Sequence, residues 1–344
     1  MSRNETGHRD TSEFDPNAPG SRGSLWGLPF DVDSAALVIL PVPWEATVSY
    51  GAGTASAPEA VLAASAQVDL FDSARPDAWR AGIAMAPISA EVREESDRTR
   101  EMVLRVLAGE AGTDVTKLVN AACERMVSRV RNEAEQLLTK GKRVGLLGGD
   151  HSTALGLMQA LSGRHGSFGI LHIDAHCDLR NAYEGFVHSH ASILRNALQI
   201  DAVQKLVQVG IRDICEEEWR LIDESAGRIR LFEDRTLARR RFSGETWASV
   251  VNEIIEELPQ AVYVSFDIDG LDPALCPGTG TPVPGGLLYE EALFLVERVL
   301  ESGRSLIGFD LCEVAPGRDG SEWDANVGAR VLYRLSCATL VAGA

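Results

Sequence analysis

The sequence predicts an α/β fold with a mainly parallel central sheet. Short apolar runs rich in Val, Ile and Leu recur along the chain, and segments with helical periodicity lie between them. Strands and helices that alternate in this way are joined by right-handed crossovers, which build a parallel sheet covered by helices. With 344 residues, 45% of them hydrophobic, the chain has enough apolar material for one large core.

The individual elements follow from the same patterns. The expected strands are the segments 35–43, 142–149, 168–176, 205–213, 261–269 and 305–314. The expected helices are the segments 114–140, 152–163, 245–258, 288–302 and 323–338. The clearest helix is 114–140, because Val115, Leu118, Met126 and other apolar residues recur there at helical spacing before Gly141.

We expect a polar, disordered N-terminal tail at residues 1–24 and a single domain at residues 25–344. The tail lacks the apolar middle section of a secretory signal. No repeat or linker divides the remainder, and no apolar run approaches the roughly 20 residues of a membrane span. The six cysteines contain no CxxC pair, which is typical of reduced thiols in the cytosol. These features predict a cytoplasmic protein.

The charge of the chain excludes two classes of partner. Fifty acidic and 33 basic residues give a formal charge of −17. This charge repels nucleic acid phosphates and anionic lipid surfaces, so neither nucleic acid nor a membrane is expected as a partner. A salty cytoplasm and attraction of a cationic substrate both account for the acidity, and composition alone does not separate them.

Polar residues follow four of the predicted strands. They are Asp150 with His151, the segment from Asp174 to Asp178, Asp267 with Asp269, and Glu313. The carboxyl ends of neighbouring parallel strands lie along one edge of a sheet, where such folds bind ligands. Extended backbone also points every second residue to the same side, so Asp174, His176 and Asp178 are expected to converge.

These acids predict a metal site. Carboxylates gathered at one edge repel each other, and burying them unpaired is costly. Lys and Arg are nearly absent from these segments, so we expect one or two divalent cations, with His151 and His176 as nitrogen ligands. A set dominated by oxygen suits Mn²⁺ best, with Fe²⁺, Co²⁺, Ni²⁺ and Zn²⁺ as alternatives. A pair of such ions activates water, which indicates hydrolysis.

Three motifs, GGDHS (148–152), DAHCD (174–178) and SFDIDGLDP (265–273), resemble in this order the ureohydrolase family of arginases, agmatinases and related guanidino hydrolases. The resemblance runs from about residue 35 to residue 340. It implies a three-layer α/β/α sandwich that assembles as a homo-oligomer, either a trimer or a hexamer. It also implies two Mn²⁺ ions held by His151, Asp174, His176, Asp178, Asp267 and Asp269.

The resemblance further implies the reaction. Hydroxide attacks the guanidinium carbon of a small guanidino substrate, and the amine leaves after protonation, so that urea remains. Glu313, in CEVAP, matches the acid that accepts hydrogen bonds from the guanidinium. In VHSHAS, His190 is the better match for the histidine that shuttles protons, and His188 is the second. Agmatine is the default substrate.

Arg180 departs from the pattern of the family, because arginases and agmatinases commonly carry a small or neutral residue at this position. A cation about 8 Å from a substrate ammonium costs roughly 2 kcal/mol at an effective dielectric of about 20. A similar HxDLR run occurs in formimidoylglutamases, whose GGGHE motif differs from GGDHS, and arginine is well shaped to bind a carboxylate. A guanidino acid or formimidoylglutamate is therefore the alternative substrate. In a third interpretation, Arg180 pairs with Glu184 or Asp178 and does not meet substrate.

Two functions of other kinds stay open. A catalytically silent, metal-stabilised oligomeric partner would keep the metal ligands but lack a working Glu313 and His190. Another metal-dependent amide hydrolase on the same fold would release no urea. Four neighbouring residues have structural interpretations: Asp150 supports the ligands, His172 is a hydrogen-bonded core histidine, Cys177 packs on the opposite face of its strand, and Trp323 anchors a core or an interface.

Overall fold

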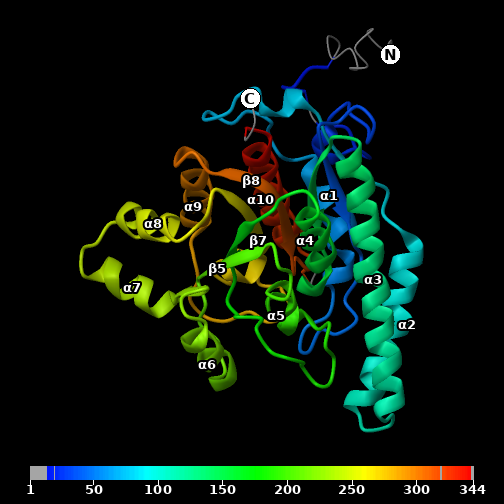
Figure 1. Ribbon diagram of the computed structural model, residues 1–344. Coiled ribbons are helices and arrows are strands. Elements are labelled where there is room, and N and C mark those ends of the chain that lie inside the picture. The colour runs from blue at the N-terminus through cyan, green and yellow to red at the C-terminus, as the bar shows by residue number, and fades with distance from the viewer. Residues whose placement is uncertain (1–13, 19, 318–319, 342–344) are drawn as a thin grey trace.

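A computed structural model of the chain describes residues 14–18, 20–317 and 320–341 (Figure 1). Within these residues eight strands form one sheet, in the order β2-β1-β3-β8-β7-β4-β5-β6. All neighbouring strands are parallel. The strands are β1 (Leu37–Pro41), β2 (Ile83–Met85), β3 (Arg143–Leu147), β4 (Phe168–Ile173), β5 (Val203–Val209), β6 (Ile229–Phe232), β7 (Ala261–Asp267) and β8 (Ser305–Cys312).

Helices form two groups around this sheet, which can be followed in Figure 1. In one group α2, α3, α4 and α5 pack in series, and α3 contacts β3; in the other, α1, α8, α9 and α10 pack together, and α10 contacts β8. This arrangement confirms the predicted three-layer α/β/α fold. The helices are α1 (Ala57–Ser65), α2 (Ala90–Leu107), α3 (Thr113–Thr139), α4 (Leu155–Ser162), α5 (Ile193–Ala197), α6 (Glu216–Glu224), α7 (Asp234–Phe242), α8 (Trp247–Glu256), α9 (Tyr289–Glu301) and α10 (Trp323–Val341).

Helix α3 shows how the apolar pattern sets the packing. Residues such as Cys123, Met126 and Val130 form a buried stripe along it, and the chain leaves the helix at Gly141, whose φ of 77° suits glycine. The expected helix 114–140 is therefore confirmed. The prediction that Leu118 belongs to the apolar face was wrong: its side chain is 58% exposed, and the buried stripe begins at Val119.

The two strands that the sequence patterns did not predict, β2 and β6, lie at the two edges of the sheet. β2 has only three residues, and β6 has buried Ile229 and Phe232 at its ends with the more exposed Arg230 and Leu231 between them. An edge strand pairs on one side only, so it needs neither the length nor the continuous apolar run of a central strand.

The predicted tail at residues 1–24 lies partly outside the described residues, which exclude 1–13 and 19. At the start of the described part, the ring of Phe14 packs 5.2 Å from that of Trp79, and Leu25 and Trp26 are buried. Within the described residues, every helix is either too short or too polar to cross a membrane.

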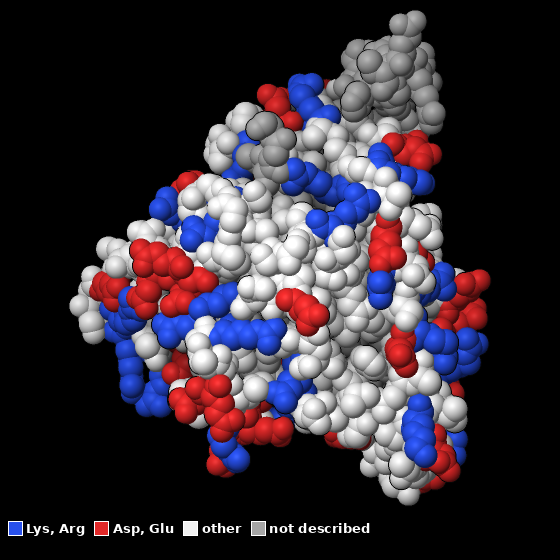
Figure 2. Space-filling view, viewed as in Figure 1, with Lys and Arg blue, Asp and Glu red and all other residues white. Residues whose placement is uncertain are grey.

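The acidic excess does not form one continuous field on the face shown in Figure 2. Lys and Arg side chains lie beside Asp and Glu side chains around the margin of this face, and uncharged residues occupy most of its middle. Many ion pairs of the described residues lie within or between helices, such as Arg131 with Glu135 in α3. Exposed pairs of this kind contribute little to stability, so the surface charge mainly affects which partners can approach.

Candidate metal centre

The candidate site lies at the carboxyl ends of β3, β8, β7 and β4, which are consecutive strands in the middle of the sheet. His151 begins the short 3-10 helix η4 (His151–Ala154) after β3, and Asp174 follows β4 directly. Asp267 ends β7, Asp269 lies in the 3-10 helix η6 (Ile268–Gly270), and Glu313 follows β8. Segments far apart in the sequence therefore meet at one edge of the sheet, as parallel topology requires.

Two glycines in the motifs allow these segments to approach each other. A Cβ atom on Gly149 would lie 1.8 Å from the backbone oxygen of Trp44, and one on Gly270 would lie 2.7 Å from the backbone nitrogen of Asp174. Any larger residue at either position would push apart the chain segments that carry the site.

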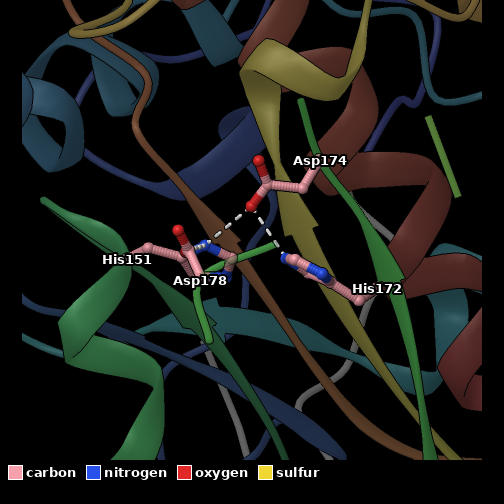
Figure 3. A group of neighbouring side chains, drawn as sticks. All are labelled: His151, His172, Asp174 and Asp178. Atoms are coloured by element: carbon pink, nitrogen blue, oxygen red, sulfur yellow. Dashed lines mark hydrogen bonds and ion pairs between the residues drawn. The ribbon is translucent and has the colours of Figure 1, made fainter. Parts of the chain in front are cut away.

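The first group of potential ligands surrounds Nδ1 of His151 (Figure 3). This nitrogen lies 3.2 Å from Oδ2 of Asp174, 3.1 Å from Oδ2 of Asp178 and 3.4 Å from Oδ2 of Asp267. All four side chains are buried. Three carboxylate oxygens and one imidazole nitrogen thus point into one small volume.

The second group shares Asp174 with the first. Nδ1 of His176 lies 3.5 Å from Oδ1 of Asp174 and 3.2 Å from Oδ2 of Asp269. The side chain of His176 is 25% exposed, whereas those of the two aspartates are buried, so this group is the more open of the two. Asp174 directs one oxygen to each group, which is the arrangement expected of a carboxylate that bridges two cations.

The donor atoms fit divalent cations. Nδ1 of His151 is buried and makes no hydrogen bond although three carboxylate oxygens lie near it. Burial raises the pKa of Asp267 well above its usual value, and the carboxylates of Asp269 and Asp174 raise it further. Burial lowers the pKa of His176, but Asp269 and Asp174 outweigh it and raise the pKa to about 12. Without a cation the cluster therefore takes up protons, and a divalent cation would supply the same positive charge.

Two polar residues of the sheet fix the imidazole ring of His151 at its Nε2 atom. Its Nε2 atom lies 2.8 Å from Oγ of Ser265, and the Ser265 hydroxyl donates a 2.9 Å hydrogen bond to Oδ2 of Asp310. Because the serine proton points to Asp310, the serine oxygen accepts from Nε2–H of His151. The lone pair of Nδ1 is then directed at the three carboxylates, as a metal ligand requires.

Glu313 lies beside these groups but outside both. Its Oε1 accepts a 2.8 Å hydrogen bond from the backbone N–H of His151, and Oε2 faces the loop at Gly280. The residue is only 5% exposed. Burial and the neighbouring carboxylate of Asp150 raise the pKa of Glu313 well above its usual value, so this position favours an incoming cationic group.

A pocket of about 150 Å³ opens beside His176 and Asp178, and its wall includes both His190 and Arg180. Burial, together with the charges of His176 and His151, lowers the pKa of His190 to about 4, so this imidazole is neutral at pH 7. The Arg180 guanidinium lies 5.0 Å from the ring of Tyr183 and forms no ion pair with the described residues Asp178 and Glu184. The interpretation in which Arg180 pairs with either acid is therefore not supported.

The structure also places the residues that had structural interpretations. His172 is buried, and both of its ring nitrogens have hydrogen-bond partners, which confirms a satisfied core histidine. Asp150 accepts hydrogen bonds from Ser152 at the start of η4, and Cys177 is buried. Trp323 is 48% exposed, so its interpretation as a core anchor was wrong, whereas the interface alternative stays a prediction.

Sequence reasoning missed several residues of the pocket, and Glu313, the predicted substrate-binding acid, does not line it. His188, the second match for the proton shuttle, does not line the pocket. Asp213 could have been found, because it follows β5 at the same sheet edge, but a single exposed acid carries little signal. Other lining residues come from loops whose positions depend on tertiary packing. The missed lining residues are Ser49, Tyr183, Ala191, Asp213, Glu218 and Thr281.

Comparison with known proteins identifies relatives along most of the chain. A model of the arginase family matches residues 35–337. An N(1)-aminopropylagmatine ureohydrolase of Synechocystis sp. is 33% identical over 303 residues, which cover 88% of each chain. A guanidinobutyrase of Pseudomonas aeruginosa is 27% identical over 318 residues, covering 90% of this chain and 88% of the relative. The crystal structure of a hypothetical agmatinase from Burkholderia thailandensis superposes with a TM-score of 0.69 at 25% identity, covering 95% of this chain and 90% of that one.

Proposed function

The chain belongs to the arginase family, and we propose that it is a binuclear metal-dependent amidinohydrolase that cleaves a guanidino compound into urea and an amine. One observation carries the proposal. Oδ2 of Asp174 lies 3.2 Å from Nδ1 of His151, and Oδ1 of the same carboxylate lies 3.5 Å from Nδ1 of His176. A single side chain thus connects two groups of ligands, each with one imidazole and at least one further carboxylate.

Six residues would hold two divalent cations, with Mn²⁺ as the first choice and Ni²⁺, Co²⁺, Fe²⁺ or Zn²⁺ as alternatives. His151, Asp178 and Asp267 belong to one group, His176 and Asp269 belong to the other, and Asp174 is shared. When bound, such a pair of ions supplies Lewis acidity, lowers the pKa of a water molecule towards neutrality and offsets negative charge that develops on the substrate.

Glu313 is the proposed anchor for the guanidinium group of the substrate. Its Oε1 is already occupied by the backbone N–H of His151, which leaves Oε2 to accept from the guanidinium. Because the carboxylate is buried, a charge-assisted hydrogen bond to it is stronger than one at an exposed site. This contact would hold the carbon of the guanidinium beside the two ligand groups.

His190 is the proposed proton carrier. Its Nε2 lies 3.5 Å from Oγ of Ser49, and its Nδ1 lies 3.3 Å from Oγ of Ser189. Its lowered pKa, about 4, keeps the imidazole neutral at pH 7, so it can accept a proton from the attacking water. When the carbon–nitrogen bond breaks, the departing amine takes up a proton, and the same imidazole can donate it.

Agmatine is the default substrate, and its N(1)-aminopropyl derivative is a second amine of the same kind. The name of the Synechocystis relative supports an amine that carries a guanidino group. Asp213 supports it as well, because this exposed acid lines the pocket and could receive a distal ammonium. We also propose that the protein is cytoplasmic and that it assembles as a trimer or a hexamer, the two states that the family resemblance implies.

Arg180 favours a second candidate, a guanidino-acid hydrolase or formimidoylglutamase. Its side chain lines the same pocket and stacks on Tyr183 without an acidic partner in the described part of the chain. A guanidinium in that position could bind a substrate carboxylate in two parallel hydrogen bonds. The name of the Pseudomonas aeruginosa relative supports this alternative.

A urea assay tests the proposal. The metal-free protein is supplied separately with Mn²⁺, Ni²⁺ and Co²⁺ and offered agmatine, N(1)-aminopropylagmatine, arginine, guanidinobutyrate, guanidinopropionate, guanidine and formimidoylglutamate. Urea from the first two substrates supports the amine-specific proposal, and urea from a guanidino acid favours the second candidate. Turnover of formimidoylglutamate would be measured by the release of formamide. Turnover of no substrate, with the metals bound, would favour the catalytically silent partner.

A further inference from the structure

Four buried polar side chains form a row across the middle of the sheet. Gln208 of β5 pairs in register with His172 of β4, which pairs with Ser265 of β7, which pairs with Asp310 of β8. None of the four has any exposed surface. Polar groups in an apolar sheet are costly unless they are hydrogen-bonded, so a row of four calls for an explanation.

The row lies one step below the ligands of the proposed metal centre. His172 precedes Asp174 by two residues, and Ser265 precedes Asp267 by two residues, so each pair shares a face of its strand. The Ser265 and Asp310 half of the row supports His151, as described above. The Gln208 and His172 half has a separate set of contacts.

The hydrogen-bond directions in this second half follow from its partners. Nε2 of Gln208 lies 2.8 Å from the backbone oxygen of Cys177 and 3.0 Å from Nδ1 of His172. A carbonyl oxygen only accepts, so the amide nitrogen donates one hydrogen to Cys177 and the other to His172. Nδ1 of His172 is then an acceptor, and the ring proton is on Nε2.

That proton completes the chain of contacts. Nε2 of His172 lies 2.7 Å from Oδ2 of Asp174 and donates to it (Figure 3). Oδ1 of the same carboxylate accepts a 2.6 Å hydrogen bond from the backbone N–H of His176. The carboxylate is therefore held at both oxygens, with each oxygen turned towards a different group of ligands.

We infer that Gln208 and His172 are positioning residues for Asp174: Gln208 selects the tautomer of His172, and His172 fixes the rotation of the shared carboxylate. This inference rests on the proposed metal centre and adds two residues to it. Because Asp174 contributes to both ligand groups, disturbing Gln208 or His172 weakens both cation sites. Disturbing Ser265 weakens only the site that contains His151.

Two measurements test this assignment, and the first begins with the wild-type chain. Nitrogen NMR of the metal-free protein labelled at histidine reports which ring nitrogen of His172 carries the proton. The hydrogen-bond directions predict a proton on Nε2 and none on Nδ1, and a proton on Nδ1 would overturn the inference. Replacement of Gln208 by Met keeps the side-chain volume but removes both N–H donors. In this variant the His172 proton is expected to lose its preference for Nε2.

The second measurement is a Mn²⁺ titration followed by electron paramagnetic resonance. Relative to the wild-type chain, Gln208→Met and His172→Phe are expected to weaken both sites by roughly 10- to 100-fold, the usual effect of losing a partner of a metal ligand. Ser265→Ala is expected to weaken one site only. Val207→Ala is the packing control, because Val207 is buried beside Gln208 in β5 but points to the opposite face.

The outcomes separate this inference from the proposed function. Two Mn²⁺ ions in the wild-type chain, with unchanged affinities in Gln208→Met and His172→Phe, overturn the positioning role alone. A wild-type chain that binds no divalent metal overturns the proposed function and this inference together. Equal weakening by Val207→Ala would assign the effect to packing and would also overturn the inference.

Discussion

Asp178 and Glu313 share a left-handed backbone conformation, with φ angles of 55° and 61°. Residues other than glycine rarely adopt this conformation, and it costs roughly 1–2 kcal/mol. In Asp178 the surrounding hydrogen bonds hold it: the backbone oxygen accepts from the N–H groups of Leu194 and Arg195, and the next N–H donates to Glu218. Both residues are acids of the proposed site, so the strain coincides with function.

Strain at Asp178 predicts a difference between two variants that lose the same carboxylate. In the metal-free state, Asp178→Gly is expected to be more stable than Asp178→Ala by roughly 1 kcal/mol, because glycine adopts positive φ without steric cost. Urea denaturation in the presence of a chelator measures the free energies of unfolding. If the alanine variant were equally or more stable, the backbone at this position would not be strained.

Loss of a shared or buried ligand should remove metal and activity together. Asp174→Ala and Asp267→Ala are expected to abolish urea release, because each removes a carboxylate that faces Nδ1 of His151. Metal content of the purified variants is measured beside turnover. Either aspartate variant retaining wild-type activity would contradict its assignment as a ligand.

Glu313→Gln separates substrate binding from metal binding. The amide keeps an oxygen for the N–H of His151 but presents N–H groups in place of Oε2, so it repels a guanidinium. The lost charge-assisted hydrogen bond is worth roughly 1.5–3 kcal/mol, which predicts a roughly 10- to 150-fold loss in kcat/KM. Metal content should stay at the wild-type level, and its loss would place Glu313 among the ligands instead.

The pKa shifts predict that metal affinity rises with pH. Metal-free His176, whose pKa is raised to about 12, and Asp267, whose pKa is also raised, hold protons that a cation must displace. Binding should therefore release protons, and it should be tighter at about pH 8 than at about pH 6. Calorimetry in buffers with different ionisation enthalpies counts the released protons. Affinity that is independent of pH would mean that the ligands are already deprotonated in the metal-free chain.

Arg180→Ala decides between the two substrate classes. If Arg180 binds a carboxylate, the variant should lose turnover of guanidino acids. Turnover of agmatine should increase, because a cation near its ammonium group is removed. Steady-state kinetics on agmatine and guanidinobutyrate measure this selectivity. Arg195→Ala is a suitable control, because Arg195 lies in α5 and does not line the pocket. Unchanged selectivity in the Arg180 variant would assign this residue a role outside substrate recognition.

Local rules explain why much of the site could be predicted from the sequence. The sequence predicted that Asp174, His176 and Asp178 converge through alternation in extended backbone, and parallel topology brings them to Asp267 at the same sheet edge. The convergence is confirmed, but β4 ends at Ile173 and the left-handed backbone of Asp178, rather than strand alternation, turns its carboxylate to the site. Gln208 was not predicted, because a polar residue inside an apolar run acquires meaning only from the register between strands. His172 was predicted as a satisfied core residue, but its contact with Asp174 depends on the same register.

Pocket residues were harder to predict for a different reason. Tyr183 and Ser49 reach the pocket from loops whose path depends on packing against distant elements, for which the sequence offers no periodic pattern. The edge strand β6 was missed because it is short and its buried and exposed residues follow no regular alternation. Chemistry at strand ends was therefore visible in the sequence, whereas the shape of the pocket was not.

The number of divalent cations bound per chain tests the central claim most directly. Protein stripped of metal is reconstituted with Mn²⁺, freed of excess ion and analysed for metal, with Asp174→Ala treated in parallel. The account predicts two ions per wild-type chain and severe loss of both in the variant, because Asp174 turns one oxygen to each ligand group. A wild-type chain that takes up no transition metal would contradict it.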